Sequence, residues 1–222
     1  DFRCTVLEQD FSGMSLRIQG KDVWTRFIGD HNASNLLAVF SAASILGAED
    51  EEVLRILSEL RSVPGRLELV EGPGGISCLV DYAHTPDALR NVISAVNRIR
   101  PGDRQLITVV GAGGDRDRAK RPRMGEIAAR LSDFVIVTSD NPRTEKPGKI
   151  IDDILSGMKG TATPYIVIEN RREAIGWALE NAKPGDIIIL AGKGHETYQI
   201  IGREKRPFDE REIVGDFLRT IK

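Results

Sequence analysis

Several features that assign a protein to a class are scarce in this sequence. Only two cysteines occur in 222 residues, Cys4 and Cys78, and they are too far apart for a metal-binding spacing. We expect both to be ordinary thiols in a reducing compartment. No apolar run is long enough to cross a bilayer, and no segment has the pattern of a signal peptide. These absences argue against a membrane-spanning or disulfide-built protein and predict a cytoplasmic one.

An excess of charge of either sign is also missing. The sequence has 31 Lys and Arg residues against 33 Asp and Glu residues, which gives a formal net charge of -2. So balanced a chain has no electrostatic footprint for nucleic acid or for an anionic membrane surface. Hydrophobic residues make up 41% and charged residues 29% of the sequence, as in globular proteins generally. The length suggests one large or two modest domains.

The sequence has no phosphate-binding loop of the form GxxxxGK[ST]. Gly192-Lys193-Gly194 is too short, and His195 stands where Ser or Thr is required. A dinucleotide-binding fingerprint is incomplete as well, because Arg116 occupies the place of the third glycine after Gly111 and Gly113. We interpret this glycine-rich segment as a turn that lets Arg116 approach an anionic ligand. The alternative is a surface loop in which Arg116 pairs with the aspartates on either side of it.

The first 64 residues have the pattern of antiparallel strands followed by two helices. Residues 14–18 and 23–27 alternate apolar and polar side chains around a turn, which predicts strands. Apolar residues at helical spacing then predict helices over residues 32–46 and 51–60. We expect this segment to be the tail of a larger domain.

The pattern changes at Val63-Pro64-Gly65, and we place a domain boundary there. Downstream, apolar strands alternate with helices, which predicts an α/β fold: a Rossmann-like, mostly parallel sheet with helices on both faces. Strands are predicted at residues 76–80, 106–110, 134–138 and 187–190, and a hairpin at 197–207. Helices are predicted at residues 86–99 and 149–158, and after the capping residues Asn170 and Asp209. The predicted domains are residues 1–64 and residues 65–222.

Each predicted strand of this sheet ends in an unusual loop. Residues 140–143, Asp-Asn-Pro-Arg, follow one strand; residues 81–86, 111–117 and 191–196 follow the others. Ligands bind at the carboxyl ends of parallel strands, so we expect the four loops to converge on one site. Asn141 offers a donor and an acceptor, and the planar guanidinium of Arg143 suits a carboxylate. This combination predicts a site for an amino-acid-like ligand with an extra carboxylate; the alternative is a turn that carries an exposed arginine.

Five motifs, in this order, resemble the Mur ligases of bacterial cell-wall synthesis: VPGR, DYAHTPDAL, GAGGDRDRAKRP, TSDNPRTEKP and AGKGHETYQ. DYAHTP is typical of the wider family. DNPR together with GGDRD and GKGHE is typical of the branch that adds the third amino acid of the peptide, and DNPR goes with meso-diaminopimelate rather than lysine. The resemblance runs from about Gly29 to the last residue. It implies that residues 65–222 are the C-terminal, amino-acid-binding domain and that residues 1–64 end a truncated central ATP-binding domain.

The resemblance also implies a reaction, the ATP-dependent formation of an amide bond. The γ-phosphate is transferred to a glutamyl carboxylate of UDP-N-acetylmuramoyl-L-Ala-D-Glu, and the amine of meso-diaminopimelate attacks the resulting acyl phosphate. Such chemistry depends on positioning and on charge neutralisation by Mg²⁺ and basic groups. In the family, the phosphate-binding loop, the magnesium ligands and the nucleotide-sugar domain precede the region matched here. We therefore expect this chain to be the C-terminal part of a longer ligase and to be inactive alone.

The motifs carry residue roles with them. The resemblance assigns seven residues to the amino-acid substrate: Arg116, Asp140, Asn141, Pro142, Arg143, Gly192 and Glu196. It assigns five residues to ATP: Asn32, Asn35, Arg66, Asp81 and His84. For Asn32 a simple helix cap is the alternative, and for His84 a structural role between loop and helix. We assign no residue to covalent catalysis or to metal binding. Two other functions stay open: a related ligase that adds lysine or glutamate, and a non-catalytic module that binds an amino acid or a nucleotide.

Overall fold

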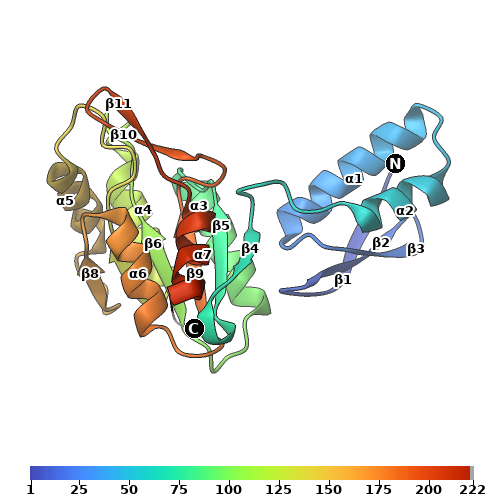
Figure 1. The fold of residues 1–222 in the computed structure, drawn as a ribbon. Helices are drawn as coiled ribbons and strands as arrows, with labels where there is room; N and C mark the ends of the chain where they lie inside the picture. The colour runs from blue at the N-terminus through green and yellow to red at the C-terminus, as the bar shows by residue number, and fades with distance from the viewer. Residues whose placement is uncertain (221–222) are drawn as a thin grey trace. The chain divides into compact units, whose positions relative to one another are not determined.

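The computed structural model describes residues 1–220, without the side chains of residues 218 and 220, and divides the chain into two compact units. The first unit comprises Asp1–Val63 and Arg98–Arg100. The second comprises Pro64–Asn97 and the residues from Pro101 onward. Each unit has its own helices and strands and its own hydrophobic core (Figure 1).

The first unit is a small antiparallel sheet with two helices. Its strands β1 (Cys4–Asp10), β2 (Gly13–Ile18) and β3 (Lys21–Thr25) pair in that order, and α1 (Asp30–Ile45) and α2 (Asp50–Glu59) follow. Alternate residues of the strands point toward the helices and form one core with them. That core includes Met14, Leu16, Ile18, Leu36, Phe40 and Leu57. The predicted antiparallel strands and both predicted helices are confirmed, with small shifts at their ends.

The second unit is built on a six-stranded sheet in the order β4-β5-β9-β6-β7-β8. β4 is antiparallel to β5, and the remaining neighbours are parallel. The strands are β4 (Glu68–Glu71), β5 (Ser77–Asp81), β6 (Leu106–Val110), β7 (Phe134–Val137), β8 (Tyr165–Val167) and β9 (Ile187–Ala191), with a separate hairpin of β10 (Tyr198–Ile201) and β11 (Glu204–Pro207). Because β9 returns between β5 and β6, the carboxyl ends of β5, β9, β6 and β7 are neighbours along one edge. The predicted mostly parallel α/β fold is confirmed.

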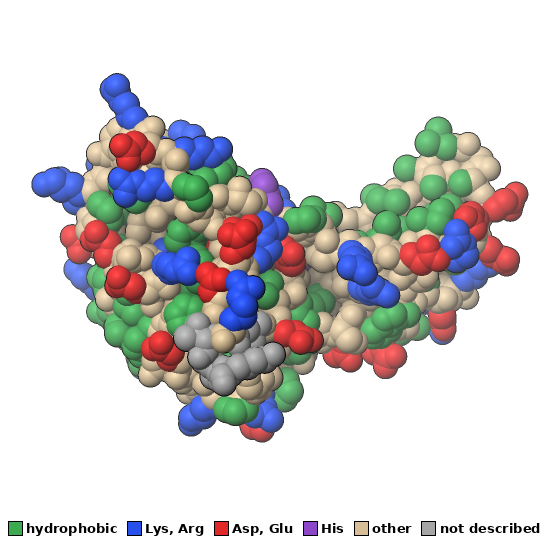
Figure 2. Space-filling view, viewed as in Figure 1, with side chains coloured by type: hydrophobic (Ala, Val, Ile, Leu, Met, Phe, Trp, Pro, Cys, Tyr) green, Lys and Arg blue, Asp and Glu red, His purple; other side chains and the backbone are tan. Residues whose placement is uncertain are grey.

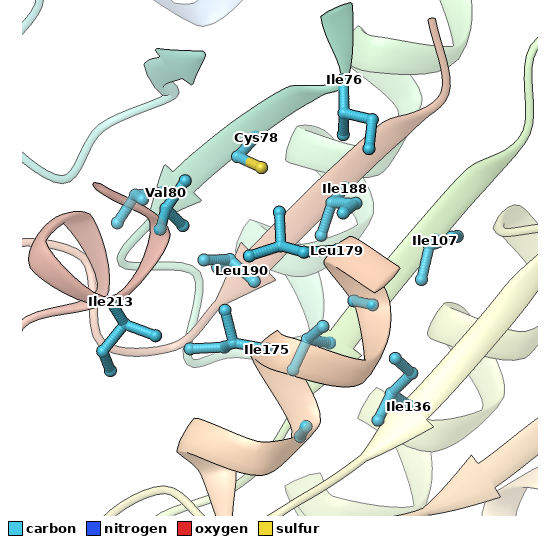
Figure 3. Packing of buried hydrophobic residues seen from close by; sticks show 14 residues of the cluster. Ile76, Cys78, Val80, Ile107, Ile136, Ile175, Leu179, Ile188, Leu190 and Ile213 are labelled. Atoms are coloured by element: carbon cyan, nitrogen blue, oxygen red, sulfur yellow. The ribbon is translucent and has the colours of Figure 1, made fainter. Parts of the chain in front are cut away.

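Helices cover both faces of this sheet (Figure 1). The connections through α3 (Pro86–Ile99), α4 (Lys120–Leu131) and α5 (Pro147–Met158) step across the sheet in one direction, from β5 toward β8. The connection through α6 (Arg171–Asn181) steps back to β9, so right-handed crossovers place α6 on the opposite face. α7 (Glu210–Thr220) packs beside α6. Figure 3 shows this second face, where Ile175, Leu179 and Ile213 pack on alternate residues of the strands.

Side chains satisfy backbone groups at three helix starts, two of them at the predicted capping residues Asn170 and Asp209. Thr85 Oγ1 accepts a backbone hydrogen bond in the first turn of α3. Asn170 Oδ1 accepts from the backbone N of Arg172 at 3.0 Å, and Asn170 Nδ2 donates to Glu173 Oε1 at 3.1 Å. Asp209 Oδ1 accepts a backbone hydrogen bond at the start of α7. These helices therefore begin where a local side chain replaces the missing backbone acceptor.

Apart from a short 3₁₀ turn at Pro73–Gly75, three elements of the second unit are not predicted from the sequence: β4, β8 and α4. β4 and β8 are short strands at the edges of the sheet, and their side chains alternate between half-buried and exposed. β4 has two apolar residues between glutamates, and β8 is apolar but only three residues long. α4 contains Pro122 and Gly125, both unfavourable in a helix. The structure shows why glycine is there: a Cβ at Gly125 would lie 2.1 Å from Ile154 O of α5. Close helix packing decides this element, and the local sequence does not reveal it.

The surface agrees with the balanced composition. Figure 2 shows Lys and Arg side chains interspersed with Asp and Glu side chains on the face turned to the viewer. Cys4 and Cys78 are both free thiols, as expected. Among residues 1–220, no helix combines the length and the apolar character needed to cross a membrane.

Candidate functional site

A pocket of about 280 Å³ opens at the sheet edge where β5, β6, β7 and β9 end. Residues from all four predicted loops line it, together with one residue of α4. The lining residues are Tyr82, His84, Thr85, Gly113, Arg116, Asp117, Lys120, Asp140, Asn141, Arg143, Gly192 and Glu196. Six of the seven residues predicted to contact the amino-acid substrate are among them. Pro142 is not; it is buried between Asn141 and Arg143.

The loop after β7 is fixed by the β10–β11 hairpin. Arg143 has a left-handed backbone with a φ of 51°, which is unfavourable for a residue other than glycine. Its backbone N donates to Ile200 O at 3.1 Å, and its backbone O accepts from Gly202 N at 2.8 Å. Asp140 and Asn141 are 5% and 4% exposed. The hairpin therefore holds a strained backbone that turns the Arg143 side chain toward the pocket.

The loops after β6 and β7 are clasped to each other. Gly114 N donates to Asn141 O at 2.8 Å, and Arg143 Nη1 donates to Gly114 O at 2.8 Å. A Cβ at position 114 would lie 1.9 Å from Pro142 O, so the contact requires glycine. At Gly114 the missing side chain makes room for the neighbouring loop, while the approach of Arg116 to an anionic ligand stays a prediction. The bond to Gly114 orients the guanidinium of Arg143 and uses only part of its donor fork.

Arg116 lies at the exposed side of the pocket. Its Nη1 donates to the backbone O of Asp115 at 3.2 Å. The carboxylate of Asp115 bonds elsewhere and accepts from Thr144 N at 3.1 Å and from Thr144 Oγ1 at 2.8 Å. Within the described part of the chain Arg116 forms no ion pair, which removes the alternative that it pairs with the aspartates beside it.

An ion-pair network around the buried Arg121 joins both loops to α4. Arg121 is wholly buried and donates to the two carboxylate oxygens of Glu145 at 3.1 and 2.8 Å, and to Asp153 Oδ2 at 2.9 Å. Glu145 also pairs with Arg118 at 3.0 Å and accepts from Asp115 N at 2.6 Å. The hydrogen bonds from Arg121 lower the pKa of Glu145 to about 2, against the opposing effect of burial. An ionised Glu145 therefore ties α4 to the two loops.

The loop after β9 contributes Glu196 and a buried lysine. Gly192 opens the loop with a left-handed φ of 120°. Glu196 Oε2 accepts from Asn141 Nδ2 at 2.8 Å. Lys193 is wholly buried, and its Nζ lies 3.3 Å from Glu196 Oε2, 3.3 Å from Asn141 Oδ1 and 3.5 Å from Asp140 Oδ1. The carboxylate of Glu196 is thus held at the pocket wall, where it can accept hydrogen bonds from an ammonium group.

His84 lines the pocket from the loop after β5. Its Nδ1 lies 2.9 Å from Tyr82 O, and its ring centroid lies 4.6 Å from that of Tyr82. Lys120 Nζ donates to the backbone O of His84 at 2.8 Å. Burial lowers the pKa of Lys120, although the charge of Asp140 opposes that change. These contacts are those of a residue that joins loop to helix, while a contact of His84 with ATP stays a prediction.

Arg66 and Asp81, also predicted to contact ATP, lie in the second unit but do not line the pocket. Asp81 is 4% exposed, and its Oδ2 accepts from Leu67 N at 2.8 Å. Burial raises the pKa of Asp81, opposed by the bond from Leu67 and the charge of Arg66. The guanidinium of Arg66 lies 5.0 Å from the ring centroid of Tyr82. In this structure Asp81 fastens residues 65–67 to the end of β5.

Asn32 and Asn35, the remaining predicted ATP contacts, lie in the first turns of α1 in the first unit. Asn32 is buried, and its Nδ2 donates to Ile28 O at 2.9 Å. Asn35 Nδ2 donates to Asn32 Oδ1 at 3.3 Å. The N-cap of α1 is Gly29, without a side-chain bond, so the alternative of Asn32 as the helix cap is wrong.

The sequence predicts no magnesium ligands in this chain, and the structure describes residues only up to residue 220. Within residues 1–220, no three His, Cys, Asp or Glu side chains gather in a metal-binding arrangement. Mg²⁺ is usually held by one or two carboxylates together with phosphate oxygens and water. The described residues therefore do not fit a magnesium site by themselves.

Two lysines of the site were missing from the residues predicted to bind a ligand. Lys120 lines the pocket, and Lys193 lies directly behind it. Each follows a glycine-containing segment, in GGDRDRAK and in AGK. That position is the only sign in the sequence that either lysine belongs to a ligand site. Their partners lie 36 and 52 residues away in the chain, so local patterns could not reveal them.

Known proteins are similar to this chain in sequence and in fold. Residues 65–194 match the family described as Mur ligase, glutamate ligase domain. A protein of Parabacteroides distasonis named UDP-N-acetylmuramoyl-L-alanyl-D-glutamate--2,6-diaminopimelate ligase is 49% identical over 221 residues, which cover 99% of this chain and 46% of the relative. A protein of the same name from Phocaeicola vulgatus is 51% identical over 217 residues, covering 97% of this chain and 45% of the relative.

A solved structure with the same name gives the corresponding structural match. It has 36% sequence identity and a TM-score of 0.71, and the match covers 100% of this chain and 46% of that one. The chain thus spans about half the length of the relatives it matches. The family match includes the whole sheet from β4 to β9 and the loops after β5, β6 and β7. The chain belongs to the Mur ligase family.

Proposed function

We propose that this chain is the amino-acid-binding part of an ATP-dependent ligase. The ligase adds meso-diaminopimelate to UDP-N-acetylmuramoyl-L-alanyl-D-glutamate in the synthesis of peptidoglycan, in the cytoplasm. The names of the relatives that are 49% and 51% identical support this substrate pair. The remaining substrates, including the nucleotide dipeptide, are bound mainly by parts of the ligase that this chain does not contain.

One observation carries the choice of amino acid: a guanidinium and a carboxylate are fixed in the same pocket. meso-Diaminopimelate has an ammonium and a carboxylate at each end, whereas lysine has only an ammonium at its distal end. Arg143 and Arg116 suit the distal carboxylate, and Glu196, held by Asn141, suits the distal ammonium. Lysine would leave the Arg143 fork without its anion in a partly desolvated site, which disfavours it.

The residues of this chain bind and orient; none of them has to form a covalent bond. With the distal end fixed in the pocket, the amine at the other end is directed out of it, toward an acyl phosphate formed elsewhere. Holding the two reacting groups at the right separation supplies much of the rate enhancement in such reactions. ATP supplies the phosphoryl group, and Asn32, Asn35, Arg66, Asp81 and His84 stay our candidates for contacting it.

Calorimetric titration of the 222-residue chain with meso-diaminopimelate, L-lysine and L-glutamate tests the proposal. A charge-assisted hydrogen bond contributes about 1.5–3 kcal/mol, so meso-diaminopimelate should bind roughly ten- to hundred-fold more tightly than lysine. Tighter binding of lysine or glutamate would replace the proposed substrate by that amino acid. Equal, weak binding of all three would contradict an amino-acid-binding role for the pocket.

A further inference from the structure

Lys193 is a buried cation that the binding of an amino acid, as proposed above, does not itself use. Its side chain is 0% exposed, and it lies behind three lining residues of the pocket without lining it. Its Nζ is 3.3 to 3.5 Å from oxygens of Asp140, Asn141 and Glu196. The rings of Tyr198 and Phe208 lie 5.9 and 5.6 Å from the ammonium. Burial of a charge destabilises the folded protein unless polar groups stabilise the charge, and three polar groups of one pocket do so here. Lys193 in turn affects the geometry and the charge of that pocket.

The first effect is on the orientation of Asn141. Its Oδ1 accepts from Lys193 Nζ at 3.3 Å and from Ile200 N at 2.9 Å, and its Nδ2 donates to Glu196 Oε2 at 2.8 Å. A flipped amide would turn NH₂ toward two donors and an oxygen toward a carboxylate. Lys193 and the backbone of Ile200 therefore select one orientation, and that orientation secures Glu196.

The second effect is on Glu196. Its Oε2 accepts hydrogen bonds from both Lys193 Nζ and Asn141 Nδ2. Within the described residues its Oε1 has no recorded hydrogen bond, and the side chain is 14% exposed at the pocket. Glu196 thus presents one oxygen to a ligand while the other is occupied from behind.

The third effect is on charge. Asp140 and Glu196 are two carboxylates in one wall of the pocket, and Lys193 contacts both. The three groups together carry one negative charge, which matches one ammonium of a ligand. Lys120 is a second cation whose charge reaches Asp140. The other charged lining residues are Arg116, Asp117 and Arg143. Without Lys193, two carboxylates would share a small volume with no cation between them.

We propose that Lys193 is a positioning residue for the ammonium end of the amino acid. It fixes the amide of Asn141 and the carboxylate of Glu196, and its charge offsets one of the two negative charges of Asp140 and Glu196. The inference rests on the proposed function, because it needs a ligand with an ammonium group in this pocket.

The test is calorimetric binding of meso-diaminopimelate to the full 222-residue chain at pH 7, with Lys193→Met, Lys193→Arg and Lys205→Met. Lys205 also lies over the Tyr198 ring, at 3.5 Å, but its side chain is exposed, which makes Lys205→Met the matched control. The wild type and Lys205→Met should bind alike. Lys193→Met should lose at least tenfold in affinity. Lys193→Arg keeps the charge and the hydrogen-bond donors and should recover most of the lost affinity.

Three outcomes would overturn the inference. The first is wild-type affinity in Lys193→Met, and the second is a loss in Lys193→Arg as large as that in Lys193→Met. Where Lys193→Met does not fold, as judged by circular dichroism, a tenfold loss in a folded Lys193→Arg would have the same meaning. Failure of the wild-type chain to bind meso-diaminopimelate would instead contradict the proposed function, so the two failures are distinct.

Discussion

At the scale of single residues, two ion-pairing or pocket-lining pairs of charged side chains near the loops of the second unit have different surroundings. Arg121 and Glu145 pair beneath the loops and do not line the pocket, whereas Arg143 and Glu196 line it. The first pair joins the loops to α4, and the second pair lies where we propose that a ligand binds. Substitutions at the two pairs should therefore have different readouts, one in folding stability and the other in binding.

Changing Glu145 to Gln should destabilise the chain in a pH-dependent way. The pKa of Glu145 is lowered from 4.5 to about 2, first by hydrogen bonds from Arg121. A carboxyl whose pKa is lowered by folding stabilises the protein above its unfolded pKa and loses that effect as the pH falls toward the folded value. The variant should thus lose about 1.5–3 kcal/mol of unfolding free energy at pH 7, because Arg121 loses a charged partner. The difference from wild type should fade between about pH 4.5 and pH 2.

The control is Glu126→Gln, which removes an exposed i,i+4 pair with Arg130 on α4. Such a pair contributes about 0.3–0.5 kcal/mol. Urea unfolding of both variants at pH 7, 4 and 3 gives the comparison. A difference between Glu145→Gln and wild type that does not change with pH would contradict the assigned ion pair.

At the scale of elements, the sequence predicts those parts whose causes are local. The buried strands are continuous apolar runs, and α3, α6 and α7 start at side chains that bond within their own first turn. The contacts that brace the loops and join the helices are long-range: Arg121 meets Glu145 24 residues later, and Arg171 meets Glu210 39 residues later. Both arginines are wholly buried, although arginine is normally exposed. In the sequence, α4 therefore has the pattern of an exposed polar segment, and only the partners of Arg121 explain its burial.

The clasp between the loops after β6 and β7 gives a prediction at this scale. In Gly114→Ala the new Cβ meets Pro142 O, so the loops must separate, at a cost of about 1–3 kcal/mol. Separation also removes the hydrogen bond that orients Arg143. The loss in binding free energy for meso-diaminopimelate should therefore be at least as large as the loss in unfolding free energy. In Gly148→Ala, in the first turn of α5, nothing lies within 4 Å of the new Cβ, so this variant should behave like wild type. Thermal unfolding and calorimetric binding of both variants decide the point; equal behaviour would rule the clasp out.

The cap of α6 gives a second prediction. Asn170→Ala removes a side chain that accepts from two backbone N–H groups, and it should cost about 1 kcal/mol. Asn181→Ala at the other end of α6 removes only a bond from Asn181 Nδ2 to Trp177 O and serves as the control. Chemical unfolding should show a clearly larger loss for Asn170→Ala. The same loss in both variants would mean that Asn170 is not an effective cap.

At the scale of the whole molecule, the chain consists of two compact units joined near Val63 and Pro64. We predict that residues 63–66 act as a hinge. Two hydrogen bonds limit where the pivot can lie. Tyr82 N donates to Gly65 O at 2.9 Å, and Leu67 N donates to Asp81 Oδ2 at 2.8 Å. Because both bonds lie within the second unit, any pivot should lie on the N-terminal side of Gly65.

The 222-residue chain alone should neither hydrolyse ATP nor transfer its phosphate. It contains no GxxxxGK[ST] loop to hold the phosphates, and no cluster of three metal-binding side chains occurs among the residues that the structure describes. Phosphate release should therefore stay at the level of buffer, with or without meso-diaminopimelate. Release from this chain that depends on meso-diaminopimelate would show that a phosphate site exists within it.

The selectivity of Arg143→Ala tests the central proposal most directly. In a full-length ligase that contains this segment, kcat/KM for meso-diaminopimelate and for L-lysine is measured in wild type, Arg143→Ala and the exposed control Arg203→Ala. Removing the guanidinium should lower kcat/KM for meso-diaminopimelate ten- to hundred-fold, about 1.5–3 kcal/mol, and affect lysine much less. The KM for ATP should hardly change, and Arg203→Ala should match wild type. If Arg143 only braces the loops through Gly114, both amino acids lose equally, and an unaltered preference for meso-diaminopimelate would contradict the assignment of Arg143 to the distal carboxylate.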